Sequence, residues 1–207
     1  MSEAFDVGRD PTAALDAAER AVGDGRLVVF PTDTVYGVGG RPDLPGATAR
    51  IFEAKQRPPR LTLPVLAAGM DQAAEVAVFD RRARGLAERF WPGAVTLVLP
   101  RAEASREWDL GAERDTVGVR VPGHETALGL LRRTGPLAVT SANRSGEPTP
   151  ATCRDVREAL GEAVAVYLCA DASVAGDTAS TVVDLTGSPP RVLREGAVPA
   201  ADVLAAL

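Results

Sequence analysis

The sequence predicts an α/β fold, built on a twisted sheet of mixed parallel and antiparallel strands flanked by helices. Short apolar runs that suit strands alternate with stretches that suit helices along most of the chain. Several connections are too short to hold a crossover helix, so some neighbouring strands must be antiparallel. No internal repeat, low-complexity tract or clear linker interrupts the pattern. We therefore expect residues 1–207 to form a single domain.

Capping and stop signals place the helices. Asp10 and Pro11 are typical of an N-cap and a first helical residue, and the helix that they begin ends near Gly23 or Gly25. The proline pair at 58–59 ends a second helix, expected over 47–54. The remaining helices are expected over 71–76, 80–90, 125–133, 152–160 and 202–207.

Apolar runs bounded by turn residues place the strands. The run LVVF at 27–30 suits a strand covered on both faces, and Pro31 ends it because proline has no N–H to donate. The polar stretch 101–115 is expected to be an irregular surface excursion. The remaining strands are expected over 63–67, 95–99, 117–121, 137–140, 164–168, 181–185 and 192–193.

Composition excludes several classes of protein. No apolar run approaches the roughly 20 residues of a membrane span, and no signal peptide is visible, so we expect a cytoplasmic protein. A net charge of −5 argues against tight non-specific binding to nucleic acid. Cys153 and Cys169 make neither a disulfide framework nor a zinc site, and we expect them to be reduced. The one histidine, His124, excludes a multi-histidine metal site and suits a helix start.

Lysine and asparagine each occur once in the chain. Of the 23 basic residues only Lys55 is a lysine, and Asn143 is the only asparagine. In a chain this rich in arginine, an isolated Lys or Asn can be retained because Arg or Asp cannot replace it. Chance is the alternative explanation.

Polar residues follow several predicted strands. Hydroxyls and glycines crowd the stretch 31–40, Thr140 to Asn143 follow another apolar run, and Ser180 precedes a third. Loops just beyond the carboxyl ends of strands are where open α/β sheets bind ligands. The alternative is an ordinary glycine-rich turn, since neither a Walker motif nor a GxGxxG helix start is present.

Cations at four positions suggest a site for a polyanion. Lys55 and Arg57 lie two apart at a helix end, Arg120 sits inside the apolar run VGVRVP, and Arg194 ends the run VLR. Lysine offers a point charge and arginine a bidentate fork to phosphate or carboxylate. The alternatives are solvated cations at a helix end and structural ion pairs.

Six motifs in order resemble the YrdC-like family, whose best-known members are threonylcarbamoyl-AMP synthases. Lys55 and Asn143 fall in the K-x-R and S-x-N signatures of that family. The motifs lie within 27–198 and read PTDTVYGVG at 31–39, KQRP at 55–58, WPGAVTLVLP at 91–100, VGVRVP at 117–122, TSANRSGEPTP at 140–150, and STVVDL at 180–185 with VLREGAV at 192–198.

The resemblance implies a twisted mixed sheet around a deep basic cavity, and a reaction. L-threonine, bicarbonate and ATP would give threonylcarbamoyl-AMP and pyrophosphate, with Mg²⁺ accompanying ATP and keeping most of its water. Downstream transferase proteins would then carry the group to tRNA, which this chain would contact at most indirectly. The alternative is a nucleotide- or RNA-binding module of the same fold without synthase activity.

The resemblance also implies residue roles. Thr34, Arg120 and Ser180 would bind threonine, and Tyr36 would form a wall of the cavity. Lys55 and Arg57 would be catalytic. The ATP contacts would be Lys55, Arg57, Thr116, Thr140, Ser141, Asn143, Thr149 and Arg194.

The chain departs from the family pattern in the loop after KQRP. Leu61 and Thr62 stand where the family often has Asn or Lys and then Pro, and Leu66 stands where a histidine sometimes occurs. The chain ends about where a catalytic domain would end, so it is expected to be the short, single-domain form.

Overall fold

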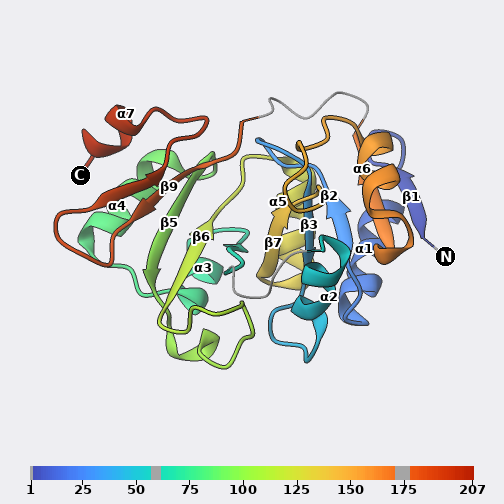
Figure 1. Cartoon of the computed structure of the whole chain (residues 1–207), viewed down its shortest axis with the longest axis horizontal. Helices are drawn as coiled ribbons and strands as arrows, with labels where there is room; N and C mark the ends of the chain where they lie inside the picture. The colour runs from blue at the N-terminus through green and yellow to red at the C-terminus, as the bar shows by residue number, and fades with distance from the viewer. Residues whose placement is uncertain (1, 57–61, 171–177) are drawn as a thin grey trace.

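A computed structural model describes residues 2–56, 62–170 and 178–207 (Figure 1). Within these residues the strands form one ten-stranded sheet in the order β1-β8-β2-β3-β7-β4-β6-β5-β9-β10. The strands are β1 (Glu3–Asp6), β2 (Val28–Phe30), β3 (Gly37–Gly40), β4 (Val65–Leu66), β5 (Val95–Pro100), β6 (Thr116–Arg120), β7 (Leu137–Ser141), β8 (Val166–Cys169), β9 (Thr181–Asp184) and β10 (Arg191–Arg194).

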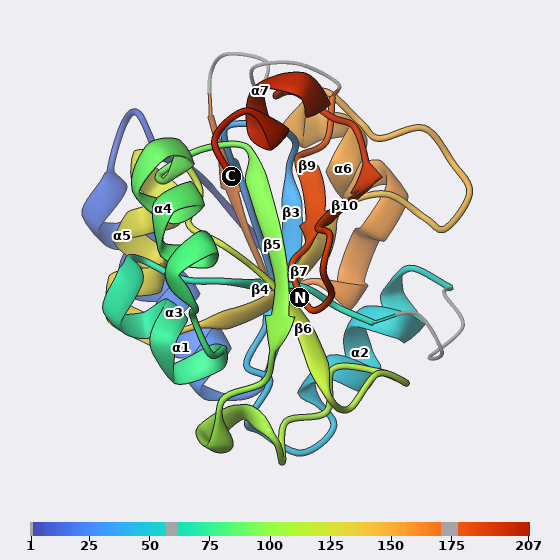
Figure 2. The ribbon, with the colours of Figure 1, turned by 90° about the vertical axis from the view of Figure 1, so that its left-hand side faces the viewer.

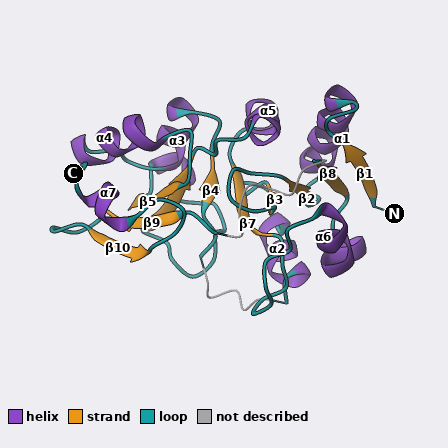
Figure 3. Cartoon of the chain, turned by 90° about the horizontal axis from the view of Figure 1, so that it is seen from above, coloured by secondary structure: helices purple, strands orange, loops and turns teal. Residues whose placement is uncertain are grey.

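Helices cover both faces of the sheet. Figures 2 and 3 show α1, α3, α4 and α5 on one face, and α2 and α6 on the other. No described helix has the length and apolar character needed to cross a membrane. The helices are α1 (Pro11–Gly23), α2 (Ala47–Ala54), α3 (Met70–Val76), α4 (Arg81–Phe90), α5 (Glu125–Thr134), α6 (Cys153–Leu160) and α7 (Ala200–Leu204).

The mixed character of the sheet is confirmed. β8 pairs in parallel with β1 and β2, and two further parallel pairs join β4 to β6 and β5 to β9. The pairs β2–β3, β3–β7, β4–β7, β5–β6 and β9–β10 are antiparallel. Short connections account for the pairs β2–β3 and β9–β10, because a hairpin needs no crossover helix. The pairs β3–β7 and β4–β7 join strands that are far apart in sequence.

The glycine-rich stretch after Pro31 corrects the sequence interpretation. Gly37–Gly40 was expected to be a loop, but it is strand β3, paired with both β2 and β7. A Cβ at Gly37 would come within 2.7 Å of Val139, and one at Gly39 within 2.9 Å of the same side chain. The glycines therefore allow β3 to lie close against Val139 on β7. Glycine has a low strand propensity, so the sequence does not predict a strand here.

Strand β1 was also missed. Its sequence EAFD has no apolar run, and its residues are mostly exposed at the edge of the sheet. Parallel pairing with β8 forms the strand. This pairing is a tertiary contact, and the local sequence does not predict it.

The expectation of reduced cysteines is wrong in this structure. Cys153, the first residue of α6, and Cys169, the last residue of β8, form a disulfide with a Cα–Cα distance of 5.4 Å. The two residues are 16 apart in sequence, and the packing of α6 against β8 brings them together.

His124 begins helix α5, as its place before the helix predicts. Its Nδ1 accepts a hydrogen bond from Thr126 N at 3.2 Å, so the ring caps the helix as an acceptor. Burial lowers the pKa of His124 below its usual 6.5, although the charges of Asp33 and Glu125 act in the opposite direction.

We expect this cap to make stability depend on pH. Because the folded pKa is lowered, the unfolded chain binds more protons near pH 6, so stability present at pH 7.5 is lost as the pH falls through 6.5. Urea unfolding should give a higher free energy of unfolding at pH 7.5 than at pH 5.5, and the difference between the two should be smaller in His124→Asn, which keeps a cap without titrating. An equal pH dependence in both proteins would contradict this role.

Candidate functional site

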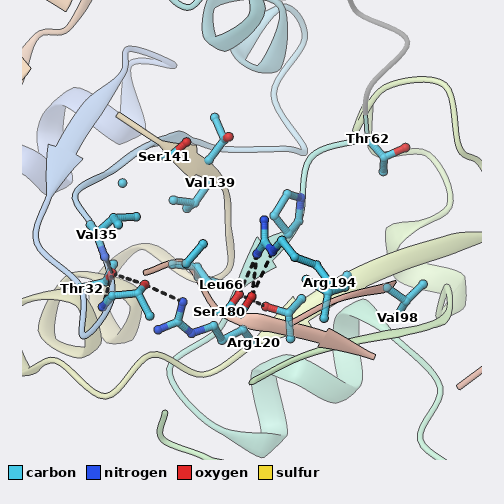
Figure 4. Close-up of a pocket in the computed structure, with 18 of the residues that line it drawn as sticks. Thr32, Val35, Thr62, Leu66, Val98, Arg120, Val139, Ser141, Ser180 and Arg194 are labelled. Carbon is cyan, nitrogen blue, oxygen red and sulfur yellow. Dashed lines mark hydrogen bonds between the residues drawn. The ribbon is translucent and has the colours of Figure 1, made fainter. Parts of the chain in front are cut away.

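A cavity of about 580 Å³ opens between the β5–β6–β9 region and the β3–β7 region of the sheet (Figure 4). Its walls carry many hydroxyls, the guanidinium groups of Arg120 and Arg194, and the carboxylate of Glu113. Of the side chains assigned to the site from sequence, eight line this cavity. They are Thr34, Thr116, Arg120, Thr140, Ser141, Thr149, Ser180 and Arg194.

The floor of the cavity follows from the two-residue period of its strands. Along β6, Val117 and Val119 pack in the hydrophobic core, and Thr116, Gly118 and Arg120 line the cavity, which Val117 also borders. The same alternation along β5 places Val95, Leu97 and Leu99 in the core and turns Thr96 and Val98 to the cavity.

Register aligns these residues into rows across the sheet. Leu66 on β4 pairs with Arg120 on β6, and Thr96 on β5 pairs with Val182 on β9. All four side chains line the cavity, as does Val98, which pairs with Gly118. Strands far apart in sequence thus contribute adjacent parts of one surface.

Arg120 lies at one end of this floor and is 5% exposed. Its Nε donates to Gly93 O at 2.8 Å, Nη1 donates to Thr34 Oγ1 at 2.9 Å, and Nη2 donates to Asp33 in an ion pair. The ion-pair interpretation of Arg120 is therefore confirmed. It does not exclude a ligand, because each terminal nitrogen has a second N–H and the side chain faces the cavity.

Asp33 is one of the polar residues that crowd the stretch 31–40, but its pairing with Arg120 was not predicted from the sequence. Burial lowers the pKa of Arg120, and the charge and hydrogen bond of Asp33 oppose this shift. The side chains of Arg120 and Asp33 are 6% and 19% exposed, so both are largely desolvated. Asp33 lies between Thr32 and Thr34, and one unremarkable acidic residue in a turn carries no signal of its partner on β6.

Replacing Asp33 by asparagine should lower the free energy of unfolding by about 3–5 kcal/mol, because it leaves a buried guanidinium without its counter-ion. Denaturant unfolding measures this directly. Asp43→Asn is the matched control: Asp43 pairs with Arg41 at a more exposed position, and its loss should cost no more than about 1 kcal/mol. Equal costs in the two variants would show that burial of the Arg120 pair has no energetic consequence.

Ser180 and Arg194 form a second polar group on the cavity wall. Ser180 Oγ lies 2.8 Å from Thr96 Oγ1, a contact that the sequence analysis did not anticipate. Arg194 donates from Nε and Nη2 to Ser180 O at 3.1 and 2.8 Å, and from Nη2 to Ser180 Oγ at 3.3 Å. Burial lowers the pKa of Arg194, and no ion pair of this residue is found within the described ranges. Arg194 therefore holds the Ser180 segment while its side chain faces the cavity (Figure 4).

Lys55 occupies a different place from the one its predicted phosphate contact suggests. The residue is 2% exposed, and its ammonium group donates to Ser141 O, to Asn143 O at 2.5 Å and to Asn143 Oδ1 at 3.1 Å. Asn143 also accepts from Ser141 Oγ at 2.6 Å, and its Nδ2 donates to Arg144 O and Glu147 O. The lone lysine and the lone asparagine thus hold the segment after β7, and Ser141 presents that segment to the cavity.

Two predicted positions lie outside the described residues, Arg57 and Leu61. Thr62 and Leu66 line the cavity at the places where the chain departs from the family pattern. Tyr36 is not part of the cavity wall described here: it is fully buried in the core, and its hydroxyl accepts from Ala170 N at 3.1 Å. Across the described residues no group of three or more His, Cys, Asp or Glu could hold a metal ion.

Comparison with known proteins identifies the family. The Sua5/YciO/YrdC model, described as "Telomere recombination", matches residues 20–196. The chain belongs to this family. The crystal structure of Sua5 from Pyrococcus abyssi complexed with L-threonine superposes with a TM-score of 0.85 at 37% identity, covering 93% of this chain and 57% of that one. YciO from E. coli superposes with a TM-score of 0.85 at 27% identity, covering 99% of this chain and 100% of that one.

Curated members of the Sua5/YciO/YrdC family extend the comparison. A protein of Mycobacterium tuberculosis strain H37Rv, provisionally named a threonylcarbamoyl-AMP synthase, is 44% identical over 203 residues, covering 96% of this chain and 92% of that protein. The threonylcarbamoyl-AMP synthase of Bacillus subtilis is 36% identical over 191 residues, covering 91% of this chain and 54% of that protein. The motif-based assignment is thereby confirmed.

Proposed function

We propose that this chain is a threonylcarbamoyl-AMP synthase, which condenses L-threonine, bicarbonate and ATP to threonylcarbamoyl-AMP and pyrophosphate. The observation that carries the proposal is one cavity with two kinds of wall. Arg120, Thr34 and Ser180 lie on the floor and side walls that suit an amino acid, while Thr116, Thr140, Ser141 and Thr149 line the part that suits a nucleotide. Curated relatives that carry this activity in their names support it.

Threonine would bind at the Arg120 end. The guanidinium is already fixed by Asp33, Thr34 and Gly93, so it can receive a carboxylate without first losing side-chain freedom. Ser180 offers a hydroxyl to the same ligand. The Sua5 structure titled as a complex with L-threonine supports an amino-acid substrate.

The chemistry needs positioning and charge more than proton transfer. Threonine and bicarbonate would give a carbamate and water. A carbamate oxygen would then bond to the α-phosphorus of ATP while the bond from that phosphorus to pyrophosphate breaks. Arg194 would neutralise charge on the leaving pyrophosphate, and Lys55 would act from beneath the 141–143 segment. Arg57 completes the proposed phosphate contacts.

Magnesium enters this proposal as an ion carried by ATP. The described residues lack a cluster of acidic or histidine ligands, which suits an ion that keeps most of its water and is held by phosphate oxygens. Bound there, it would neutralise part of the phosphate charge. The oxygen-bearing side chains that could contact this ion or its water are the hydroxyls of the cavity and Glu113, which all line the same cavity.

The wider setting follows from the product. Threonylcarbamoyl-AMP is a mixed anhydride that a second protein must consume, and we propose that transferase proteins in the cytoplasm use it to modify tRNA. A net charge of −5 does not favour tight direct contact with the tRNA backbone.

Pyrophosphate release tests the function. The purified protein with L-threonine, bicarbonate, Mg²⁺ and ATP should release pyrophosphate, and omission of threonine should stop the release. Release that does not depend on threonine would overturn the proposal, and so would no release at all. Salt-dependent binding of tRNA without synthase activity would instead identify a binding module of the same fold.

A further inference from the structure

Gly118 lies at the centre of the cavity floor. It stands on β6 between Arg120 and Thr116, and all three residues line the cavity. Alternate residues of a strand are about 6.7 Å apart, so Arg120 and Thr116 are separated by about 13 Å along β6. Gly118 is midway between the proposed threonine contact and a proposed nucleotide contact.

The row that contains Gly118 is apolar where it lines the cavity. Val98 pairs with Gly118 across β5 and β6, and Pro64 lies beside it on the β4 side. Pro64 and Val98 line the cavity as well. Polar side chains occupy the neighbouring rows at Thr96, Arg120 and Thr116, whereas Pro64, Gly118 and Val98 bring no side-chain donor or charge to the cavity. The next residue of the row, Asp184 on β9, pairs with Val98 and is not among the residues that line the cavity.

The backbone does not require glycine at this position. Gly118 is absent from the described glycines that have positive φ, so an L-residue can adopt its conformation. A Cβ there would lie 3.3 Å from Thr96 Cγ2 and 3.4 Å from Pro64 Cβ. Both contacts are with residues that line the cavity, so an added side chain would project into the space above the floor.

We propose that Gly118 forms the floor beneath the reacting atoms, where the carbamate of threonine meets the α-phosphate of ATP. The inference rests on the proposed function and gives it a location. Threonine held at Arg120 and a nucleotide held near Thr116 must approach each other over the residue between them. A side chain at position 118 would keep the carbamate oxygen from the α-phosphorus while leaving each substrate its own contacts.

The test compares Gly118→Ala and Gly118→Val with the wild-type protein. Calorimetry measures binding of L-threonine alone and of Mg²⁺–ATP alone, and a coupled assay measures pyrophosphate release with all substrates present. We expect each separate affinity to stay within about 3-fold. Pyrophosphate release should fall about 10-fold in Gly118→Ala and at least about 100-fold in Gly118→Val, because small misplacements of reacting groups cost this much.

Gly129→Ala is the matched control. A Cβ at Gly129, on helix α5, would lie 3.2 Å from Leu15 Cδ1, a contact as tight as the one at Gly118 and outside the residues that line the cavity. This variant should release pyrophosphate at the wild-type rate. It separates the effect of added bulk in a packed region from the effect of bulk on the cavity floor.

Full activity in Gly118→Val would overturn the inference. Loss of binding of one separate substrate would overturn it too, because Gly118 would then lie inside a single binding site. If Gly118→Val does not fold, Gly118→Ala decides alone, with its thermal unfolding midpoint as the check on folding. Absence of pyrophosphate release by the wild-type protein would count against the proposed function, and unchanged separate affinities in the variants would still be measurable.

Discussion

Replacing Arg120 by alanine should lower kcat/KM for threonine by about 10³-fold. The guanidinium is buried and held by Gly93, Thr34 and Asp33, so it meets the cavity in one orientation. A carboxylate that binds a fixed, desolvated arginine loses both its charge partner and its paired hydrogen bonds when the side chain is removed. Affinity for Mg²⁺–ATP alone should change little.

Arg120→Lys separates charge from geometry. Lysine keeps the positive charge but not the planar fork, so it cannot replace the bonds to Gly93 and Thr34 while presenting paired N–H groups to a carboxylate. We expect activity between the wild type and Arg120→Ala. Arg191→Ala removes an exposed arginine from β10 and should leave threonine kinetics unchanged.

Folding must be followed in the same experiment. Arg120→Ala leaves Asp33 without its partner, but this carboxylate is 19% exposed and retains some contact with water. Circular dichroism and thermal unfolding should therefore report a folded protein. A protein that loses activity only because it unfolds would show that Arg120 serves the ion pair alone, and normal threonine kinetics would contradict its proposed contact.

Replacing Lys55 by methionine should lower pyrophosphate release by about 10²–10³-fold. Methionine has nearly the same length as lysine but no donors. The oxygens of Ser141 and Asn143 would therefore lose the hydrogen bonds that they accept from the ammonium group. The segment that presents Ser141 and Thr140 to the cavity would then be less ordered, and the positive charge beneath it would be gone. Binding of threonine at Arg120 should persist, whereas affinity for ATP should fall.

Lys55→Arg tests why this chain has one lysine among so many arginines. Lys55 is 2% exposed and its ammonium group is surrounded by oxygens of one short segment, so a larger planar guanidinium should not fit. We expect pyrophosphate release by Lys55→Arg to be at least about 10-fold lower than that of the wild type. Arg50→Met is the control, since Arg50 lies on the same helix α2 but is exposed and bonded to Gly25 O. Wild-type activity in Lys55→Arg would leave chance as the better explanation for the composition.

The local patterns that predicted the helices were strong ones. Asp10 accepts from Ala13 N and Thr152 accepts from Asp155 N, which are the caps that their positions before helical runs indicate. The apolar runs likewise located most strands, because burial on a sheet selects Val and Leu wherever the strand lies. The strand Gly37–Gly40 was not predicted because it depends on pairing with β7. The close approach of its glycines to Val139, 99 or more residues away, cannot be seen in the local sequence.

Some features of the candidate site could also be predicted from local sequence, and others could not. The alternation Thr-Val-Gly-Val-Arg at 116–120 could have been read from the sequence as one core face and one open face, although only Arg120 was noted from the residues themselves and Thr116 came from the family resemblance. The contacts of Lys55 could not: residues 55 and 143 meet only because α2 packs near β3 and the segment after β7. Asp33, Thr96 and the pairing of Cys153 with Cys169 were missed for the same reason.

The sequence by itself determined the family, the order of most elements and eight of the residues that line the cavity, because those depend on local chemistry and on motifs that stand in a fixed order. Only the tertiary structure decided what each residue contacts. Strand register aligns Leu66 with Arg120 and Thr96 with Val182, and it leaves Gly118 bare between the two ends of the floor. Register depends on the pairing of distant strands, and no single stretch of sequence contains that information.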